Sequence, residues 1–161
     1  MKFTIVIPLY NKEKHIARAI NSVLNQSYKE FEIIVVDDGS TDFGVIEVKK
    51  LNDSRIRLVQ QSNLGVSSAR NKGISLAKFD FIGFLDADDV WKLDFLETIC
   101  LLIKKYPEAG AFATAYEIIK KDSEIVIPRS VLSIPNGWEG IVDDYFRLAL
   151  KSPLISASSV V

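Results

Sequence analysis

Three short apolar runs, each ending in polar or acidic residues, constrain the fold of this chain more than any other feature. The runs cover residues 3–7, 31–36 and 79–85 and are rich in β-branched and aromatic side chains. Such runs are typical of buried parallel strands, and segments with helical spacing of apolar residues separate them. The pattern predicts an α/β fold with a doubly wound, mostly parallel sheet that has helices on both faces.

The polar residues that follow these runs should lie together at one edge of the sheet. In an open α/β sheet, ligands bind outside the carboxyl ends of the strands. Those ends carry Pro8, Tyr10 and Asn11 after the first run, Asp37 and Asp38 after the second, and Asp86, Asp88 and Asp89 after the third. We therefore expect a ligand at this acidic edge.

The spacing of apolar residues also predicts the remaining elements. Helices are expected over residues 13–26, 41–51, 66–77 and 95–106, and a further strand over 56–59. Asn11 should cap the first helix, and Ser40, Thr41 or Asp42 the second. Farther along, we expect strands at 111–119 and 124–127, a helix at 143–150 and a strand beginning at 156. Because the chain stops on that apolar segment, the domain is predicted to be C-terminally incomplete at Val161.

The composition fits one globular domain over residues 1–161 and excludes several function classes. The formal net charge of −1 gives no case for a nucleic-acid partner, which would require a basic face. Cys100 is the only cysteine, so an internal disulfide is impossible and a core position is expected. His15, the only histidine, lies in the first turn of a charged helix, so a histidine-based triad is not expected.

Membrane insertion is not expected from the sequence. No stretch approaches the roughly 20 apolar residues of a membrane span, and the apolar start of the chain is too short for a signal sequence. A cytoplasmic protein is expected, with peripheral association at the inner face of a membrane left open.

The acids at the predicted sheet edge point to a bound cation. Several carboxylates in one cleft cost free energy unless a cation neutralises them or some become protonated. Oxygen ligands without Cys or His favour a hard ion, Mg²⁺ or Mn²⁺. The chain has no Gly-Lys-Ser/Thr loop and no Gly-x-Gly-x-x-Gly, so basic side chains such as Arg70 should help the metal hold phosphates. The alternatives are turns and helix caps for the acids, including Asp89, and a structural ion pair for Arg70.

Four ordered motifs resemble the family 2 glycosyltransferases with the GT-A fold, which is Rossmann-like. They occupy residues 6–11, 35–42, 63–73 and 84–89. The resemblance implies a donor-binding half over residues 1–106 and the start of an acceptor-binding half over 107–161. It implies an inverting transferase that uses a nucleotide-diphosphate sugar, most simply a UDP-sugar, with Mn²⁺ or Mg²⁺. The acceptor would be a hydroxyl of a glycan or lipid-linked molecule in polysaccharide or cell-surface glycan synthesis.

The resemblance also implies roles for individual residues. The donor-binding set is Pro8, Tyr10 and Glu13 bordering the nucleotide, Asp38 on the base, Arg70 beside the nucleotide, and Asp86 and Ala87 of the Asp-x-Asp motif. Asp88 is the first candidate for the metal ligand. Asp89 is the second, because a doubled acid leaves the register open.

The general base that inversion requires is expected beyond Val161, so the 161 residues alone are not expected to transfer sugar to the acceptor. Asp143 and Asp144 are the only acids late enough to consider, and they match no family motif. The alternatives are a donor-binding module without activity and a sugar nucleotidyltransferase, although the Gly-rich basic loop of the latter is absent after the first strand. A phosphoacceptor receiver domain would need an acid pair there, and the sequence has none.

Overall fold

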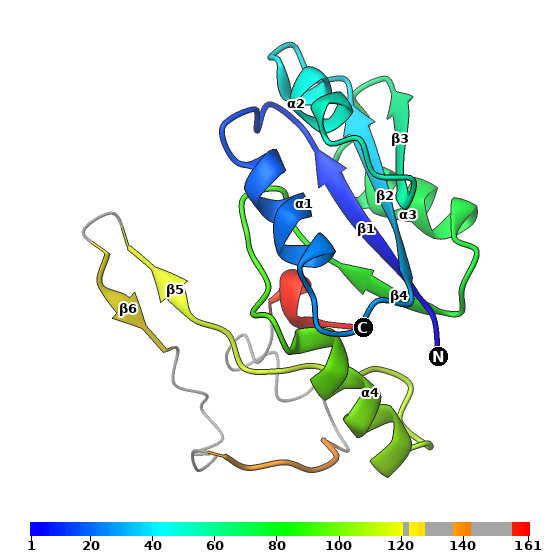
Figure 1. The fold of residues 1–161 in the computed structure, drawn as a ribbon, viewed down its shortest axis with the longest axis vertical. Coiled ribbons are helices and arrows are strands. Elements are labelled where there is room, and N and C mark those ends of the chain that lie inside the picture. Colours follow the sequence, from blue (N-terminus) through cyan, green and yellow to red (C-terminus); the bar gives the residue numbers. More distant parts are fainter. Residues whose placement is uncertain (121–122, 128–136, 143–155) are drawn as a thin grey trace.

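The computed structural model describes residues 1–120, 123–127, 137–142 and 156–161, and a four-stranded parallel sheet lies at its centre (Figure 1). The strands are β1 (Phe3–Leu9), β2 (Phe31–Asp38), β3 (Ile56–Gln61) and β4 (Phe81–Phe84). Their spatial order is β3-β2-β1-β4, so the two fully buried strands lie in the middle. The predicted parallel sheet is confirmed.

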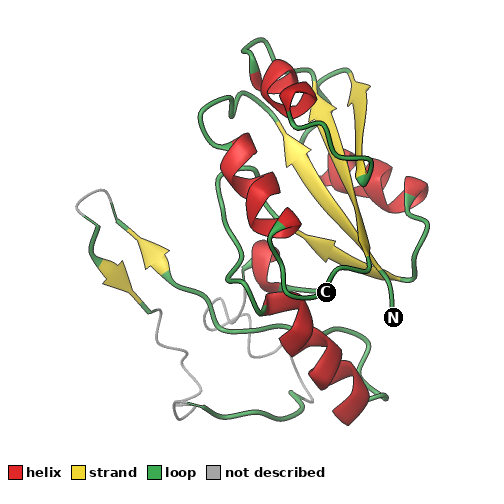
Figure 2. Cartoon of the chain, viewed as in Figure 1, coloured by secondary structure: helices red, strands yellow, loops and turns green. Residues whose placement is uncertain are grey.

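Helices cover both faces of this sheet, as the sequence predicted (Figures 1 and 2). The larger core packs α1 (Ile16–Leu24), α2 (Gly44–Lys50) and α4 (Phe95–Lys105) against one face. On the other face, α3 (Val66–Leu76) covers the side chains of Ile34 and Val36. Cys100 is buried in the larger core, as expected. No helix in the described part of the chain is both long and apolar enough to cross a membrane.

The contact between α3 and β1 requires a glycine. A Cβ atom added at Gly73 would lie 2.3 Å from Cγ1 of Val6, far inside van der Waals contact. Val6 points to this face because side chains alternate along β1, and its neighbours Ile5 and Ile7 point into the larger core. Gly73 therefore sets the distance between helix and sheet, and with it the position of every side chain on α3.

The helix boundaries differ from the predicted ones where the loops at the sheet edge begin. α1 starts at Ile16, and Asn11 does not cap it. Asn11 instead has a φ of 51° and accepts a hydrogen bond from the N–H of Thr41 through Oδ1. The N-cap position of α2 is Phe43 and none of the three predicted residues, although Asp42, one of them, accepts a hydrogen bond from the N–H of Gly44, the first residue of α2. Asp89 caps no helix, because α4 starts only at Phe95.

The predictions beyond α4 are partly wrong. Of the strand expected at 111–119, the structure has β5 (Ile118–Ile119), which pairs antiparallel with β6 (Ile125–Val126) as expected, and an isolated antiparallel bridge from Ala113 to Val160. The strand expected from residue 156 begins later than predicted, because residues 157–159 form the 3-10 helix η1 (Ala157–Ser159) and only Val160 and Val161 pair in extended form. Serine side chains explain the helical turn, because Ser156 and Ser159 form a capping box that competes with extended pairing. The expected helix at 143–150 lies outside the described residues, as do Asp143 and Asp144.

Candidate functional site

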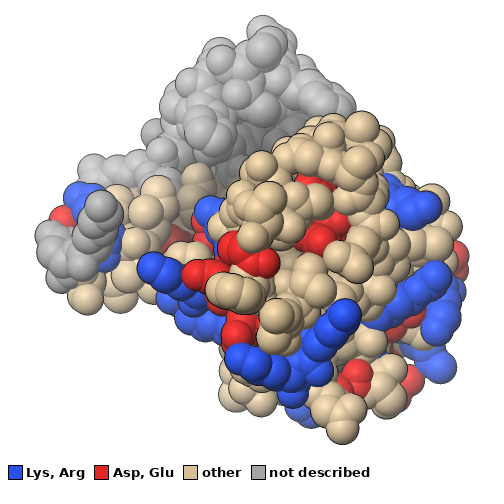
Figure 3. All heavy atoms as spheres, turned by 90° about the horizontal axis from the view of Figure 1, so that it is seen from above, with Lys and Arg blue, Asp and Glu red and all other residues tan. Residues whose placement is uncertain are grey.

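The strand order makes the ends of β1 and β4 the topological switch point of the sheet. The chain runs from β1 outward through β2 to β3 and then returns to the far side of β1 to form β4. In open α/β sheets, ligands bind outside the carboxyl ends of the strands at such a switch point. Tyr10 to Glu13 follow β1, and Asp86 to Asp89 follow β4, so these segments border it. The view from above shows exposed acidic side chains on this part of the molecule, with basic side chains beside them (Figure 3).

Asp86 is held by a residue of α3. Nη2 of Arg70, on α3, lies 2.6 Å from Oδ1 of Asp86. The backbone N–H of Asp86 donates to Oγ of Ser158 at 2.9 Å, which ties the acidic turn to η1. Nε of Arg70 is buried and has no hydrogen-bond partner among the described residues. Arg70 therefore forms the structural ion pair that the sequence left open, and it keeps one donor for a further acceptor.

Asp88 is held from the opposite side, by the loop after β1. Nζ of Lys12 lies 2.5 Å from Oδ2 of Asp88, and Arg18 on α1 donates to the main-chain oxygen of Asp88 at 2.9 Å. The hydrogen bond from Lys12 lowers the pKa of Asp88 below its ordinary value, and burial opposes this shift only in part. Asp89 is exposed, and its N–H closes the turn by donating to the carbonyl of Asp86 at 3.0 Å. Ala87 is buried beneath the turn.

Asp38 lies at the end of β2 and is only 3% exposed. Its carboxylate accepts the N–H of Leu64 at 2.9 Å, the N–H of Gly65 at 2.8 Å and Nε2 of Gln61 at 2.8 Å. Burial by itself raises the pKa of this carboxyl. The hydrogen bonds, led by the one from Leu64, outweigh burial and lower the pKa below its ordinary value. Asp38 thus fixes the turn that leads into α3, and its predicted contact with a base stays a prediction.

The five edge aspartates do not form the single cluster that the sequence predicted. No group of three or more Asp, Glu, His or Cys side chains in the described part of the chain could hold one ion. The reason is the strand order, because β1 separates the end of β2 from the end of β4. The aspartates after β2 and those after β4 are therefore two strand spacings apart, and each spacing is about 4.8 Å. Asp37 is also occupied, since it accepts from Gln60 at 3.0 Å and from the N–H of Ser40 at 3.0 Å.

Two loops at this edge are joined by reciprocal hydrogen bonds. The N–H of Glu13 donates to Oδ2 of Asp42 at 2.8 Å, and Oε2 of Glu13 accepts the N–H of Phe43 at 3.0 Å. Asn11 repeats the pattern, because its N–H donates to Oγ of Ser40 at 3.1 Å while its Oδ1 accepts from Thr41.

Of the residues predicted to border the nucleotide, Tyr10 is 47% exposed and Pro8 is buried within β1. Glu13 takes part in the hydrogen bonds that join the two loops. Sequence reasoning missed Lys12 and the connecting roles of Asn11 and Asp42. The charged stretch at residues 12–14 carries no signal that separates Lys12 from Lys14.

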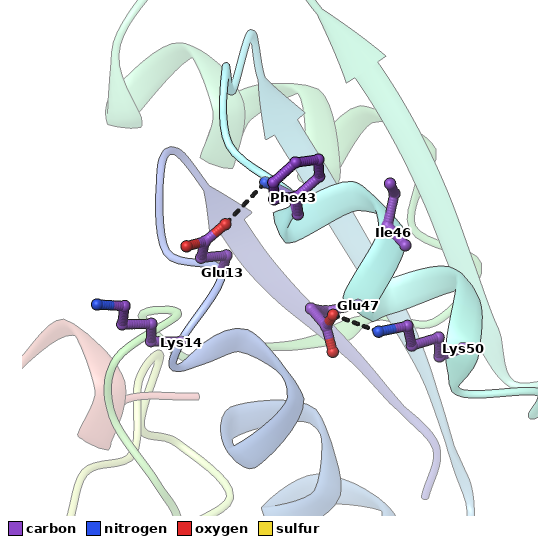
Figure 4. Close-up of a pocket in the computed structure, with 6 residues that line it drawn as sticks. All are labelled: Glu13, Lys14, Phe43, Ile46, Glu47 and Lys50. Carbon is purple, nitrogen blue, oxygen red and sulfur yellow. Dashed lines mark hydrogen bonds and ion pairs between the residues drawn. The ribbon is translucent and has the colours of Figure 1, made fainter.

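A shallow hollow of about 480 Å³ opens next to the hydrogen bond between Glu13 and Phe43 and not at the switch point. Six residues from the loop after β1, from α2 and from the position before α2 line it, namely Glu13, Lys14, Phe43, Ile46, Glu47 and Lys50. Figure 4 shows the carboxylate of Glu13 turned toward the N–H of Phe43 and Glu47 paired with Lys50. Since none of the edge aspartates lines this hollow, we do not assign the donor site to it.

The chemistry of the acidic turn fits the divalent cation that the family resemblance implies. Mg²⁺ and similar ions are commonly held by one or two carboxylates, with water and substrate phosphates completing the shell. The side chain of Asp88 is 44% exposed and Asp89 is exposed, so both can offer oxygen to an ion shared with a diphosphate. Asp86 is less suited, because its cationic partner Arg70 is more buried than Lys12, the partner of Asp88, with 25% of the side chain exposed against 41%.

Comparison with known proteins gives consistent relatives. The family model described as "Glycosyl transferase family 2" matches residues 4–155. The Escherichia coli protein named UDP-Glc:alpha-D-GlcNAc-diphosphoundecaprenol beta-1,3-glucosyltransferase WfgD is 36% identical over 132 residues, which are 80% of this chain and 52% of WfgD. Glycosyltransferase GlyA of Streptococcus pneumoniae is 37% identical over 117 residues, 71% of this chain and 17% of GlyA. The chain thus spans between about a sixth and about half of these two relatives.

Solved structures agree with the observed sheet. Residues 1–349 of TarS from S. aureus, in complex with UDP-GlcNAc, match with a TM-score of 0.71 and 29% identity, over 81% of this chain and 38% of that one. The mannosyltransferase PcManGT from Pyrobaculum calidifontis, in complex with GDP-Man and Mn²⁺, matches with a TM-score of 0.64 and 25% identity, over 71% of this chain and 36% of that one. Together with the parallel sheet and the acidic turn after β4, these matches show that the chain belongs to glycosyl transferase family 2 and has the GT-A fold.

Proposed function

We propose that this chain binds a nucleotide-diphosphate sugar at the β1/β4 switch point and forms the donor-binding part of an inverting glycosyltransferase. The observation that carries the proposal is the pairing of Asp86 with Arg70 and of Asp88 with Lys12 at that switch point. Two carboxylates and two cations at one ligand-binding edge suit a metal-bound diphosphate, which needs partners of both signs.

A UDP-sugar is the donor we favour. WfgD, the relative named above, carries UDP-Glc in its name, and TarS was solved with UDP-GlcNAc. PcManGT was solved with GDP-Man, so a GDP-sugar is the donor to compare. A glycan or lipid-linked acceptor is consistent with the diphosphoundecaprenol acceptor in the name of WfgD.

The proposed roles of the residues follow from their positions. Asp88, assisted by Asp89, would hold Mn²⁺ or Mg²⁺, which when bound stabilises negative charge on a departing diphosphate. Arg70 fixes Asp86 through Nη2, and its buried Nε has no partner among the described residues. Exposed Tyr10 would border the nucleotide, since it follows Leu9, which pairs with Asp37 next to Asp38. An acceptor hydroxyl attacking from the face opposite the diphosphate would invert the anomeric carbon.

Thermal-shift measurements with nucleoside diphosphates and their sugars, with and without Mn²⁺, test this proposal. A ligand that binds only the folded state raises the melting temperature by an amount that grows with the logarithm of its concentration relative to Kd. We expect UDP with Mn²⁺ to stabilise the chain more than either does alone. Asp88→Asn should remove most of the metal-dependent part. Asp80→Asn is the matched control, because Asp80 is exposed at the opposite end of β4.

Two results would contradict the proposal. If none of the UDP or GDP compounds stabilises the wild-type chain, the switch point is not a donor site. If Asp88→Asn behaves like Asp80→Asn in calorimetric titrations with Mn²⁺, the metal ligand lies elsewhere.

A further inference from the structure

We propose that Lys12 is a built-in counter-ion of Asp88, which opposes binding of free metal and so makes metal binding depend on the nucleotide diphosphate. The inference rests on the proposed function, because it concerns the same metal ligand. It assigns a role to a residue that the family motifs, as read from the sequence, leave without one.

The contact between these residues spans the site. Nζ of Lys12 lies 2.5 Å from Oδ2 of Asp88, although 76 positions separate the two residues. Lys12 belongs to the loop after β1 and Asp88 to the turn after β4, so the pair lies across the switch point. Both side chains keep access to solvent, with exposed fractions of 41% and 44%. An exposed pair of this kind can open and close readily.

Lys12 and a metal ion compete for the carboxylate of Asp88. Mg²⁺ binds carboxylate oxygens at about 2.0–2.1 Å, which places it next to an ammonium that already contacts Oδ2. Two like charges on one carboxylate repel each other, so the ammonium weakens binding of the ion, and binding of the ion favours displacement of the ammonium. Arg18 also faces Asp88, but it donates to the main-chain oxygen and does not occupy the carboxylate. His15 is the remaining basic group that acts on Asp88, at longer range.

Coupling to the nucleotide follows from the fate of the displaced ammonium. A diphosphate bound at the switch point offers Lys12 another anion, so displacement from Asp88 costs less when the nucleotide is present. By thermodynamic linkage, the nucleotide then raises metal affinity by the same factor as the metal raises nucleotide affinity. The pair would therefore keep the site from filling with metal alone.

Lys14 provides a matched control within the same loop. It carries the same charge two positions away, is exposed, and makes no ion pair with any residue that the structure describes. Substitution of Lys14 therefore reports the general effect of removing a positive charge near the site. Lys12→Arg retains a cation that can reach Asp88, and Lys12→Met removes it at similar length.

The experiment is a titration of each variant with Mn²⁺, followed by the electron paramagnetic resonance signal of the free ion, without and with UDP. Without UDP, Lys12→Met should bind Mn²⁺ about two- to fivefold more tightly than wild type, the size expected for loss of one exposed ion pair. Lys12→Arg should stay near wild type, and Lys14→Met should change less than Lys12→Met. The factor by which UDP strengthens Mn²⁺ binding should fall in Lys12→Met.

Each outcome decides the question. Equal or weaker Mn²⁺ binding by Lys12→Met, or the same gain in Lys14→Met, overturns the role of Lys12 while leaving the donor site intact. Mn²⁺ binding that responds to Lys12 but not to UDP overturns the proposed donor site and the coupling to the nucleotide, and leaves only the competition between Lys12 and the ion. If neither wild type nor Lys12→Met binds Mn²⁺ with or without UDP, both proposals are wrong.

Discussion

Glu13 and Phe43 connect the two loops that border the predicted nucleotide site, through a 3.0 Å hydrogen bond from the N–H of Phe43 to Oε2 of Glu13. Phe43 is the residue before α2, so this bond satisfies one of the free backbone donors at a helix start. Glu13 therefore caps a helix 30 positions away in sequence, and the cap fixes the loop that carries Tyr10 relative to the end of β2.

Glu13→Ala should lower the free energy of unfolding by about 1 kcal/mol, the usual cost of losing a helix cap. Glu13→Gln should retain most of the stability, because its amide oxygen can still accept from Phe43. Urea denaturation monitored by circular dichroism measures both variants. Equal losses in Ala and Gln would show that the negative charge of Glu13 matters more than the cap.

Asp38→Asn should destabilise the chain by about 1–3 kcal/mol. The amide nitrogen of asparagine would face a backbone N–H that now donates a hydrogen bond to the carboxylate. Leu64 and Gly65 each donate an N–H to a different oxygen of the Asp38 carboxylate. An asparagine amide has only one oxygen, so in either orientation one of these two N–H groups would lose its acceptor. Urea denaturation at neutral pH measures the loss. An unchanged free energy of unfolding would mean that the turn before α3 rearranges at little cost.

Gly73→Ala should destabilise the chain by about 1–3 kcal/mol, because the new Cβ would overlap Val6 and force α3 away from β1. Gly110→Ala is the control, since nothing lies within 4 Å of its Cβ position. That control should be neutral or slightly stabilising, through reduced freedom of the unfolded chain. Equal behaviour of the two variants in thermal unfolding would contradict the close contact.

Asp53 and Arg55 predict a pH dependence of stability. Side-chain hydrogen bonds from Arg55 lower the pKa of Asp53 to about 2. A carboxyl whose pKa is lower in the folded state stabilises the fold above its unfolded pKa, and this contribution disappears as the pH falls through the folded value.

Asp53→Asn should therefore cost about 1–2 kcal/mol at pH 7, after allowance for the partial exposure of the pair. About half of this difference should be gone by pH 3. Urea denaturation of both proteins between pH 7 and 3 gives the comparison. A difference that stays constant with pH would show that the ionisation of Asp53 is not the source of the stability.

The apolar pattern of the sequence determined the layers of this fold. Ile16, Ala19, Ile20 and Val23 recur at helical spacing and are all fully buried on α1. The continuous apolar runs likewise marked β1 and β2, because strands buried on both faces need no polar side chain. The sequence also placed the acidic turn directly after β4. These features are local, and each depends on spacing within a single segment.

The tertiary structure alone decided how the charges pair. Lys12 contacts Asp88 across 76 positions and Arg70 contacts Asp86 across 16, and no spacing in the sequence encodes either choice. The predicted single cluster of acids was wrong because β1 lies between the strands that carry them. Partners for charged side chains are chosen by distances between segments, and those distances exist only once the strands are ordered and α3 packs on Val6 through Gly73.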